Sequence, residues 1–145
     1  MSDIGMILDR LGRKLVIEVA PKLEGDYSGG HAAMSGLMAV MAGEAWDNAA
    51  DRLVNEIAGM RGLLALGGVA VETPQSTTVK ISDLTIERDA LAVALIKLQT
   101  ELESRDDAAA VDLNAKIWMH LMATAMTRMP SPPDFPDDEP EAAPD

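Results

Sequence analysis

Few side chains in this sequence can do acid–base, nucleophilic or metal chemistry. The 145 residues include two histidines, His31 and His120, and no cysteine. Without cysteine there are no disulfides, thiol nucleophiles or thiolate metal sites. Neither histidine follows a glutamate by three residues, as the histidines of di-iron helical bundles do. We therefore expect no metal, no cofactor and a non-enzymatic protein. An enzyme with one histidine as general base is the remaining hypothesis.

Methionines recur at helical spacing in two parts of the sequence. One stripe consists of Met34, Met38 and Met41, and a second of Met119, Met122, Met126 and Met129. Residues three and four apart lie one above another on a helix, so each stripe occupies one helix face. Flexible methionine side chains fill gaps in cores and also form adaptable binding surfaces. The stripes are core if they face each other, and a partner or ligand site if either is exposed.

A ligand site is the second interpretation of these stripes. The residues expected to line it are Tyr27, His31, Met34, Met38, Trp118 and Met122. The glycine-rich stretch before His31 enters a helix, and the backbone N–H groups at a helix N-terminus favour anions. Its glycine spacing matches no phosphate-loop fingerprint, so an ordinary capped turn is the simpler interpretation.

Small residues recur at a spacing of four along the first stripe. Ala32 is followed in this way by Gly36, and Ala39 by Gly43. Such spacing allows two helix backbones to approach closely. We expect these four residues at a helix–helix interface, either inside a bundle or between two copies of the chain.

Negative charge is concentrated at the C-terminus. The formal net charge is −12, and residues 130–145 include six acidic residues but no lysine or arginine. An acidic surface is unfavourable for nucleic-acid phosphates and for anionic membranes. No apolar run approaches the roughly 20 residues of a membrane-spanning helix, and no secretory signal is visible. These features predict a cytoplasmic protein that binds protein partners or itself, but neither nucleic acid nor membrane.

Helices are the elements that must position all of these residues. Apolar periodicity predicts them at about residues 2–20, 31–66, 83–103 and 107–129, with a bend or break near Gly43. In the third helix, leucines form the apolar stripe, and Glu87 is expected on the solvent side. Residues 24–30 and 67–78 are expected as loops.

The predicted architecture is all-α, an antiparallel up-down bundle of four to five helices. Residues 1–129 form a single domain of two hairpins, 1–66 and 79–129, joined by the linker 67–78. The proline-rich acidic tail, residues 130–145, is expected to be disordered.

Two functions remain open at this point. The first is a non-enzymatic interaction or accessory protein that acts through its Ala/Met-rich helix face and self-associates as a homodimer. The alternative is a helical bundle that binds an apolar or acyl small molecule between the methionine stripes, with Tyr27 and His31 at the entrance.

Overall fold

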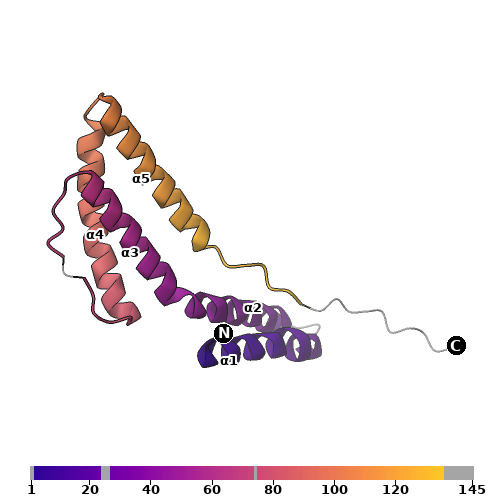
Figure 1. Ribbon diagram of the computed structural model, residues 1–145. Coiled ribbons are helices and arrows are strands. Elements are labelled where there is room, and N and C mark those ends of the chain that lie inside the picture. Colours follow the sequence, from indigo (N-terminus) through magenta and orange to yellow (C-terminus); the bar gives the residue numbers. More distant parts are fainter. Residues whose placement is uncertain (1, 24–26, 74, 136–145) are drawn as a thin grey trace. The chain divides into compact units, whose positions relative to one another are not determined.

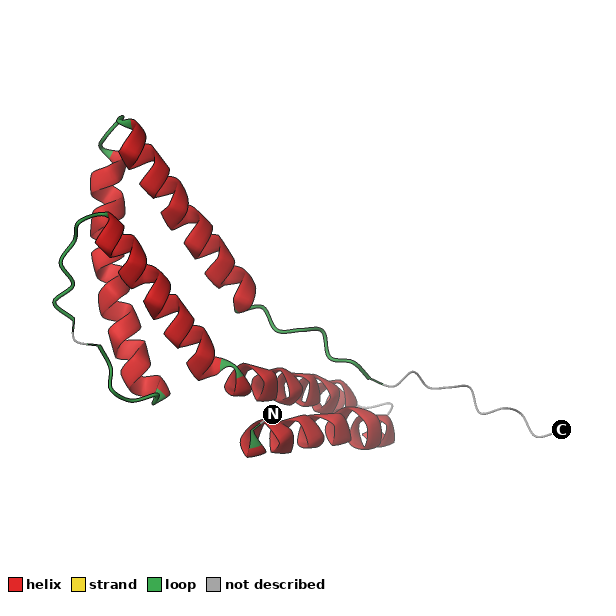
Figure 2. Ribbon diagram, in the orientation of Figure 1, coloured by secondary structure: helices red, strands yellow, loops and turns green. Residues whose placement is uncertain are grey.

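The computed structural model contains helices as its regular elements, and it describes residues 2–23, 27–73 and 75–135 (Figure 2). The α-helices of these residues are α1 (Asp3–Lys14), α2 (Tyr27–Asp47), α3 (Ala49–Leu66), α4 (Ile81–Glu103) and α5 (Ala108–Thr127). The predicted all-α class is thereby confirmed for this part of the chain. None of these helices is long and apolar enough to cross a membrane. Residues 136–145, within the tail that we expected to be disordered, lie outside the described residues.

Contacts divide the chain into two compact units. Unit 1 comprises Met1–Asp47 and Pro130–Asp145, and unit 2 comprises Asn48–Met129. This division differs from the expected hairpins, because it falls at Asn48 and not within residues 67–78. Asn48 separates α2 from α3, whereas α2 runs through Gly43 without the expected break.

In unit 1, α1 and α2 pack side by side in opposite directions, with glycines at their contact (Figure 1). A Cβ atom on Gly12 would lie 2.5 Å from the carbonyl oxygen of Gly36, and one on Gly43 would lie 2.8 Å from that of Gly5. Real Cβ atoms essentially never come closer than 3.0 Å to such atoms. The two backbones therefore touch directly, and Val40 is the one buried hydrophobic residue among the described residues of this unit.

Between α1 and α2 the chain changes its helical type. A π-helical turn, Leu15–Val19, follows α1, and a 3-10 turn, Ala20–Leu23, follows that. Pro21 lies in the 3-10 turn, near the end that we expected for the first helix. Residues 27–30, expected to belong to a loop, form the first turn of α2. Residues 24–26 of that expected loop lie outside the described residues.

In unit 2, α3 and α4 run in the same direction and α5 runs against both (Figure 1). Arg61 of α3 binds Glu87 near the start of α4, and Gly67, directly after α3, contacts Leu98 further along α4. The expected alternation of direction thus holds for α1–α2 and for α4–α5. The α3–α4 pair is parallel, because residues 67–80 are long enough to return the chain to the starting end.

The hydrophobic core of unit 2 lies among α3, α4 and α5. Its largest fully buried side chains are Leu64, Leu91 and Ile117, one from each helix. α4 contributes the leucine stripe that the spacing predicted, Leu84, Leu91, Leu95, Leu98 and Leu102. α5 buries only Ala110 and Ile117, so most of its apolar side chains remain outside the core.

The chain from Pro130 to Phe135 lies along unit 1. The backbone N and Oγ of Ser131 donate to the Glu44 carboxylate at 3.0 and 2.9 Å. Arg13 donates from Nη1 to the carbonyl oxygen of Asp134 at 2.6 Å, and its guanidinium lies 5.6 Å from the centre of the Phe135 ring. These first residues of the acidic tail are therefore docked on α1 and α2.

Candidate interaction surface

Three methionines of the second stripe, Met119, Met122 and Met126, lie on the solvent-exposed side of α5, and Met129 follows directly after the C-cap of this helix. Met119, Met122, Met126 and Met129 expose between 59% and 67% of their surface. Ala110 and Ile117, on the opposite side of the helix, face the core. The stripe is therefore not part of the core of unit 2.

Neighbouring apolar side chains widen this stripe into a surface. Val111, Trp118 and Leu121 are also exposed, and we call the seven residues together the α5 face. From Ile117 to Thr127 the helix carries no Asp, Glu, Lys or Arg. The charged residues of α5 are Asp112 and Lys116, which pair with each other at 2.7 Å. Large exposed patches without charge mark interaction sites on soluble proteins.

α4 also exposes apolar side chains, but in a different setting. Ile86, Val93 and Ile96 are exposed on this helix. Asp89 and Lys97, both exposed, lie among them in the sequence. The outer side of α4 is therefore mixed, as is normal for a solvated helix.

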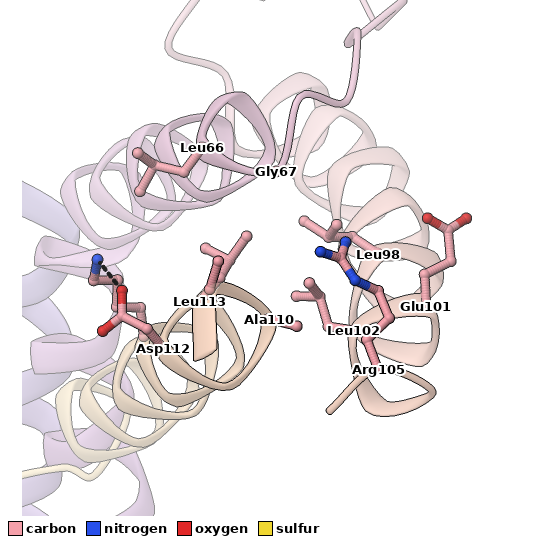
Figure 3. Close-up of a pocket in the computed structure, with 11 residues that line it drawn as sticks. Leu66, Gly67, Leu98, Glu101, Leu102, Arg105, Ala110, Asp112 and Leu113 are labelled. Atoms are coloured by element: carbon pink, nitrogen blue, oxygen red, sulfur yellow. Dashed lines mark ion pairs between the residues drawn. The ribbon is translucent and has the colours of Figure 1, made fainter. Parts of the chain in front are cut away.

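A pocket of about 330 Å³ lies at the end of unit 2 that holds the α4–α5 turn (Figure 3). Its apolar lining comes from three helices, with Leu66, Leu98, Leu102 and Leu113. Charged side chains at its rim pair with near neighbours: Arg105 with Asp107 at 2.8 Å, and Lys116 with Asp112. The pocket thus presents leucine side chains together with charged ones, and Glu101 is also among its lining residues.

A buried carboxylate holds the connection between α3 and α4. Glu87 is 4% exposed, and its Oε1 accepts from Arg61 Nη2 at 2.7 Å while its Oε2 accepts from the backbone N of Ser76 at 2.7 Å. Arg61 also donates to the carbonyl oxygen of Thr73 at 3.0 Å. The expectation that Glu87 faces solvent was wrong. Its spacing of three from Leu84 and four from Leu91 places it on the leucine side, a signal that the sequence contained.

His120 packs against α3 where a side chain is missing. A Cβ atom on Gly59 would lie 2.5 Å from its Cε1 atom, so glycine at this position admits the imidazole. His120 is half-buried and lines a pocket of about 220 Å³ with Asn55 and Thr124 among others. The Oδ1 atom of Asn114 is buried and finds no hydrogen-bond donor among the described residues.

The six residues predicted for a ligand site divide between the units. All four residues on α2 are exposed: Tyr27, His31, Met34 and Met38. The rings of Tyr27 and His31 contact edge to face, with their centroids 4.4 Å apart. Trp118 and Met122 belong to the α5 face of unit 2. The pockets described above are lined by other residues.

The four residues predicted for an interface are half-buried or buried in unit 1. Gly36 and Gly43 are buried against α1 of the same chain, and Ala32 and Ala39 are half-buried. The close helix contact that the spacing predicts is thus an intramolecular one, and Gly36 and Gly43 are covered by α1. Sequence reasoning missed its other half, Gly5 and Gly12. Gly5 and Gly12 are seven residues apart, as are Gly36 and Gly43. This shared spacing is the signal in the sequence that could have identified α1 and α2 as packing partners.

No three His, Asp or Glu side chains of the described residues gather as a metal-binding group. Comparison of the chain with protein-family models, with curated proteins and with solved structures finds no match.

Proposed function

We propose that this protein is a non-enzymatic interaction protein that self-associates through the α5 face. The observation that carries the proposal is the exposure of all four methionines of the second stripe. Exposed apolar side chains gain free energy when a partner removes them from water. The α5 face takes the place of the interface first expected at Gly36 and Gly43, since α1 covers those residues.

A second copy of the chain fits this face because of charge. The protein carries a formal net charge of −12, so two copies repel each other across most of their surface. The segment Ile117–Thr127 carries no formal charge, and two copies can approach there with little repulsion. A two-fold dimer places the same surface of both copies in contact, so a neutral apolar face is complementary to itself.

Methionine spacing also suits helix-to-helix packing. Within α5, Met119, Met122 and Met126 follow steps of three and four, the spacing of the a and d positions of a heptad. Side chains at this spacing interdigitate with those of a facing helix. Methionine adapts its shape to such a contact, and its sulfur packs well against aromatic rings such as that of Trp118.

Sedimentation velocity of the full chain tests this proposal. We expect the wild-type protein to form dimers at protein concentrations of roughly 1 to 100 µM. A dissociation constant of about 1 µM, at the lower end of this range, corresponds to an association free energy of about −8 kcal/mol. The double variant Met122→Glu, Met126→Glu should be monomeric with an unchanged far-UV circular dichroism spectrum, because a buried unpaired carboxylate opposes association. The matched control is Val93→Glu, which places the same charge on the exposed side of α4 and should still dimerise.

Three results would reject the α5 face as the dimer interface. They are a monomeric wild-type protein at the highest concentration, a dimeric double variant, and equal loss of dimer in the Val93→Glu control. If the double variant loses helicity, Met122→Gln and Met126→Gln, which add polarity without charge, provide the same comparison.

A further inference from the structure

Arginine side chains from three helices line another pocket of unit 2. Arg52 of α3, Arg88 of α4 and Arg128, the C-cap of α5, surround a volume of about 270 Å³. The rest of the lining is Ala49, Leu53 and Glu56. The chain has 24 acidic and 12 basic residues. Three arginines at one pocket are therefore a local reversal of the overall charge.

Two carboxylates pair with arginines of this pocket. Glu56 is the single carboxylate of the lining, and Arg128 Nη2 binds its two oxygens at 2.7 and 2.8 Å. Asp89 Oδ1 lies 3.0 Å from Arg88 Nε, but the Asp89 side chain is 62% exposed and lies outside the lining. The described residues that line the pocket thus include three arginines and one carboxylate.

Arg88 lines this pocket and lies beside Asp89. Its Nε atom is buried and finds no hydrogen-bond acceptor among the described residues, since Asp89 is near enough for an ion pair but not aligned for a hydrogen bond. Arg128 uses Nη2 on Glu56, and a guanidinium has five N–H donors in all.

A neighbouring pocket extends the site with neutral polar groups. The pocket of about 220 Å³ that His120 lines shares Arg52, Glu56 and Arg128 with the arginine pocket. Asn55 and Thr124 add an amide and a hydroxyl. A ligand anchored at the arginines would thus meet further hydrogen-bonding groups beside them.

Two of the arginines also hold α5 to α3. Arg52 Nη1 donates to the carbonyl oxygen of Thr127 at 3.3 Å, and Arg128 binds Glu56. These contacts give Arg52 and Arg128 a structural role. Arg88 comes from α4 and takes no part in these contacts; its ion pair is with Asp89 of the same helix.

We propose that this arginine pocket binds a phosphate group, either inorganic phosphate or the phosphate of a small molecule. Guanidinium groups bind phosphate through paired N–H donors. Groups that converge from three helices suit a tetrahedral anion with oxygens in several directions better than a planar carboxylate. None of the residues that line this pocket belongs to the α5 face, and the proposal does not depend on self-association.

Phosphate titration of the full chain, followed by the NMR signals of the arginine Nε–H groups, tests the proposal. We expect saturable shifts of the Arg88 and Arg128 signals at constant ionic strength. Acetate, the second arm of the experiment, should bind at least about fivefold more weakly, because it has fewer oxygens for the three arginines. Arg88→Gln should weaken phosphate binding about tenfold, the effect of one hydrogen bond to a charged group.

Arg105→Gln is the matched control, because Arg105 also pairs with a nearby aspartate but lines a different pocket. Its phosphate affinity should stay within about twofold of the wild type. The proposal is overturned by the lack of a saturable response, by acetate binding as tight as phosphate, or by equal weakening in the two variants. If Arg88→Gln does not fold, Arg88→Lys carries the test, since lysine keeps the charge but not the planar donor fork.

Discussion

Gly12 and Gly36 face each other so closely that neither can carry a methyl group without moving the helices apart. A Cβ atom on Gly36 would lie 2.6 Å from the carbonyl oxygen of Gly12 and 2.7 Å from a side-chain atom of Val16. A backbone oxygen cannot rotate away as a flexible side chain can. At the scale of single residues, the missing side chain is therefore what permits the α1–α2 contact.

Gly36→Ala is expected to destabilise unit 1 by roughly 1–3 kcal/mol, the usual cost of overpacking a close contact. Gly30→Ala in the same helix is the control. It meets nothing within 4 Å and should stabilise the helix by about 0.4–1 kcal/mol. Urea unfolding followed by Trp46 fluorescence, in a Trp118→Phe background, reports on unit 1. Equal effects of the two substitutions would show that the α1–α2 contact is looser than described.

At the scale of elements, Asp107 joins the α4–α5 turn to the start of α5. Its Oδ2 accepts from Arg105 Nε at 2.8 Å and its Oδ1 from the backbone N of Ala110 at 3.0 Å. The hydrogen bond from Arg105, followed by that from Ala110, lowers the pKa of Asp107 below its ordinary value of 3.8. A lowered pKa in the folded state means that the carboxylate stabilises the fold above the ordinary pKa. This contribution is lost as the pH falls through the lowered value.

Asp107→Asn should keep the helix cap, because asparagine caps helices about as well as aspartate, but it removes the titrating group. The free energy of unfolding should therefore fall less between about pH 6 and about pH 3 in this variant than in the wild type. Asp106→Asn, at the exposed residue beside it, should follow the wild type. If Asp107→Asn kept the full wild-type pH dependence of the free energy of unfolding, that result would contradict the role assigned to the Asp107 carboxylate.

At the scale of the whole molecule, the two units differ in how much core they possess. Every buried hydrophobic side chain described lies in unit 2 except that of Val40. Unit 1 depends on close backbone contact, on the hydrogen bonds of Ser131 to Glu44, and on the contacts of Arg13 with residues 134 and 135. Small units with little buried apolar surface are marginally stable.

A fragment of residues 48–129 is accordingly expected to fold alone, with a helical spectrum and cooperative urea unfolding. A fragment of residues 1–47 lacks both a core and the contacts from residues 130–135, and it should show little helix. Circular dichroism of the two fragments makes the comparison. Cooperative unfolding of the fragment 1–47, or non-cooperative unfolding of the fragment 48–129, would contradict the conclusion that the buried core of unit 2 is what allows a unit to fold alone.

Sequence alone determined what depends on neighbours along the chain. Helical spacing identified the all-α class, the leucine side of α4 and the common face of Met119, Met122 and Met126, because residues three and four apart share a helix face wherever the helix lies. It also indicated that Gly36 and Gly43 take part in a close helix contact, because a glycine lets a second backbone approach closely whichever helix that backbone belongs to.

Tertiary structure alone decided which faces are covered. The methionine stripe of α5 is exposed and Glu87 is buried, although apolar periodicity treats methionine as core and glutamate as solvated. The pocket of Arg52, Arg88 and Arg128 joins residues from three helices, and no local spacing relates them. Burial and electrostatic environment depend on what lies opposite a face, and that is fixed by contacts between segments distant in the sequence.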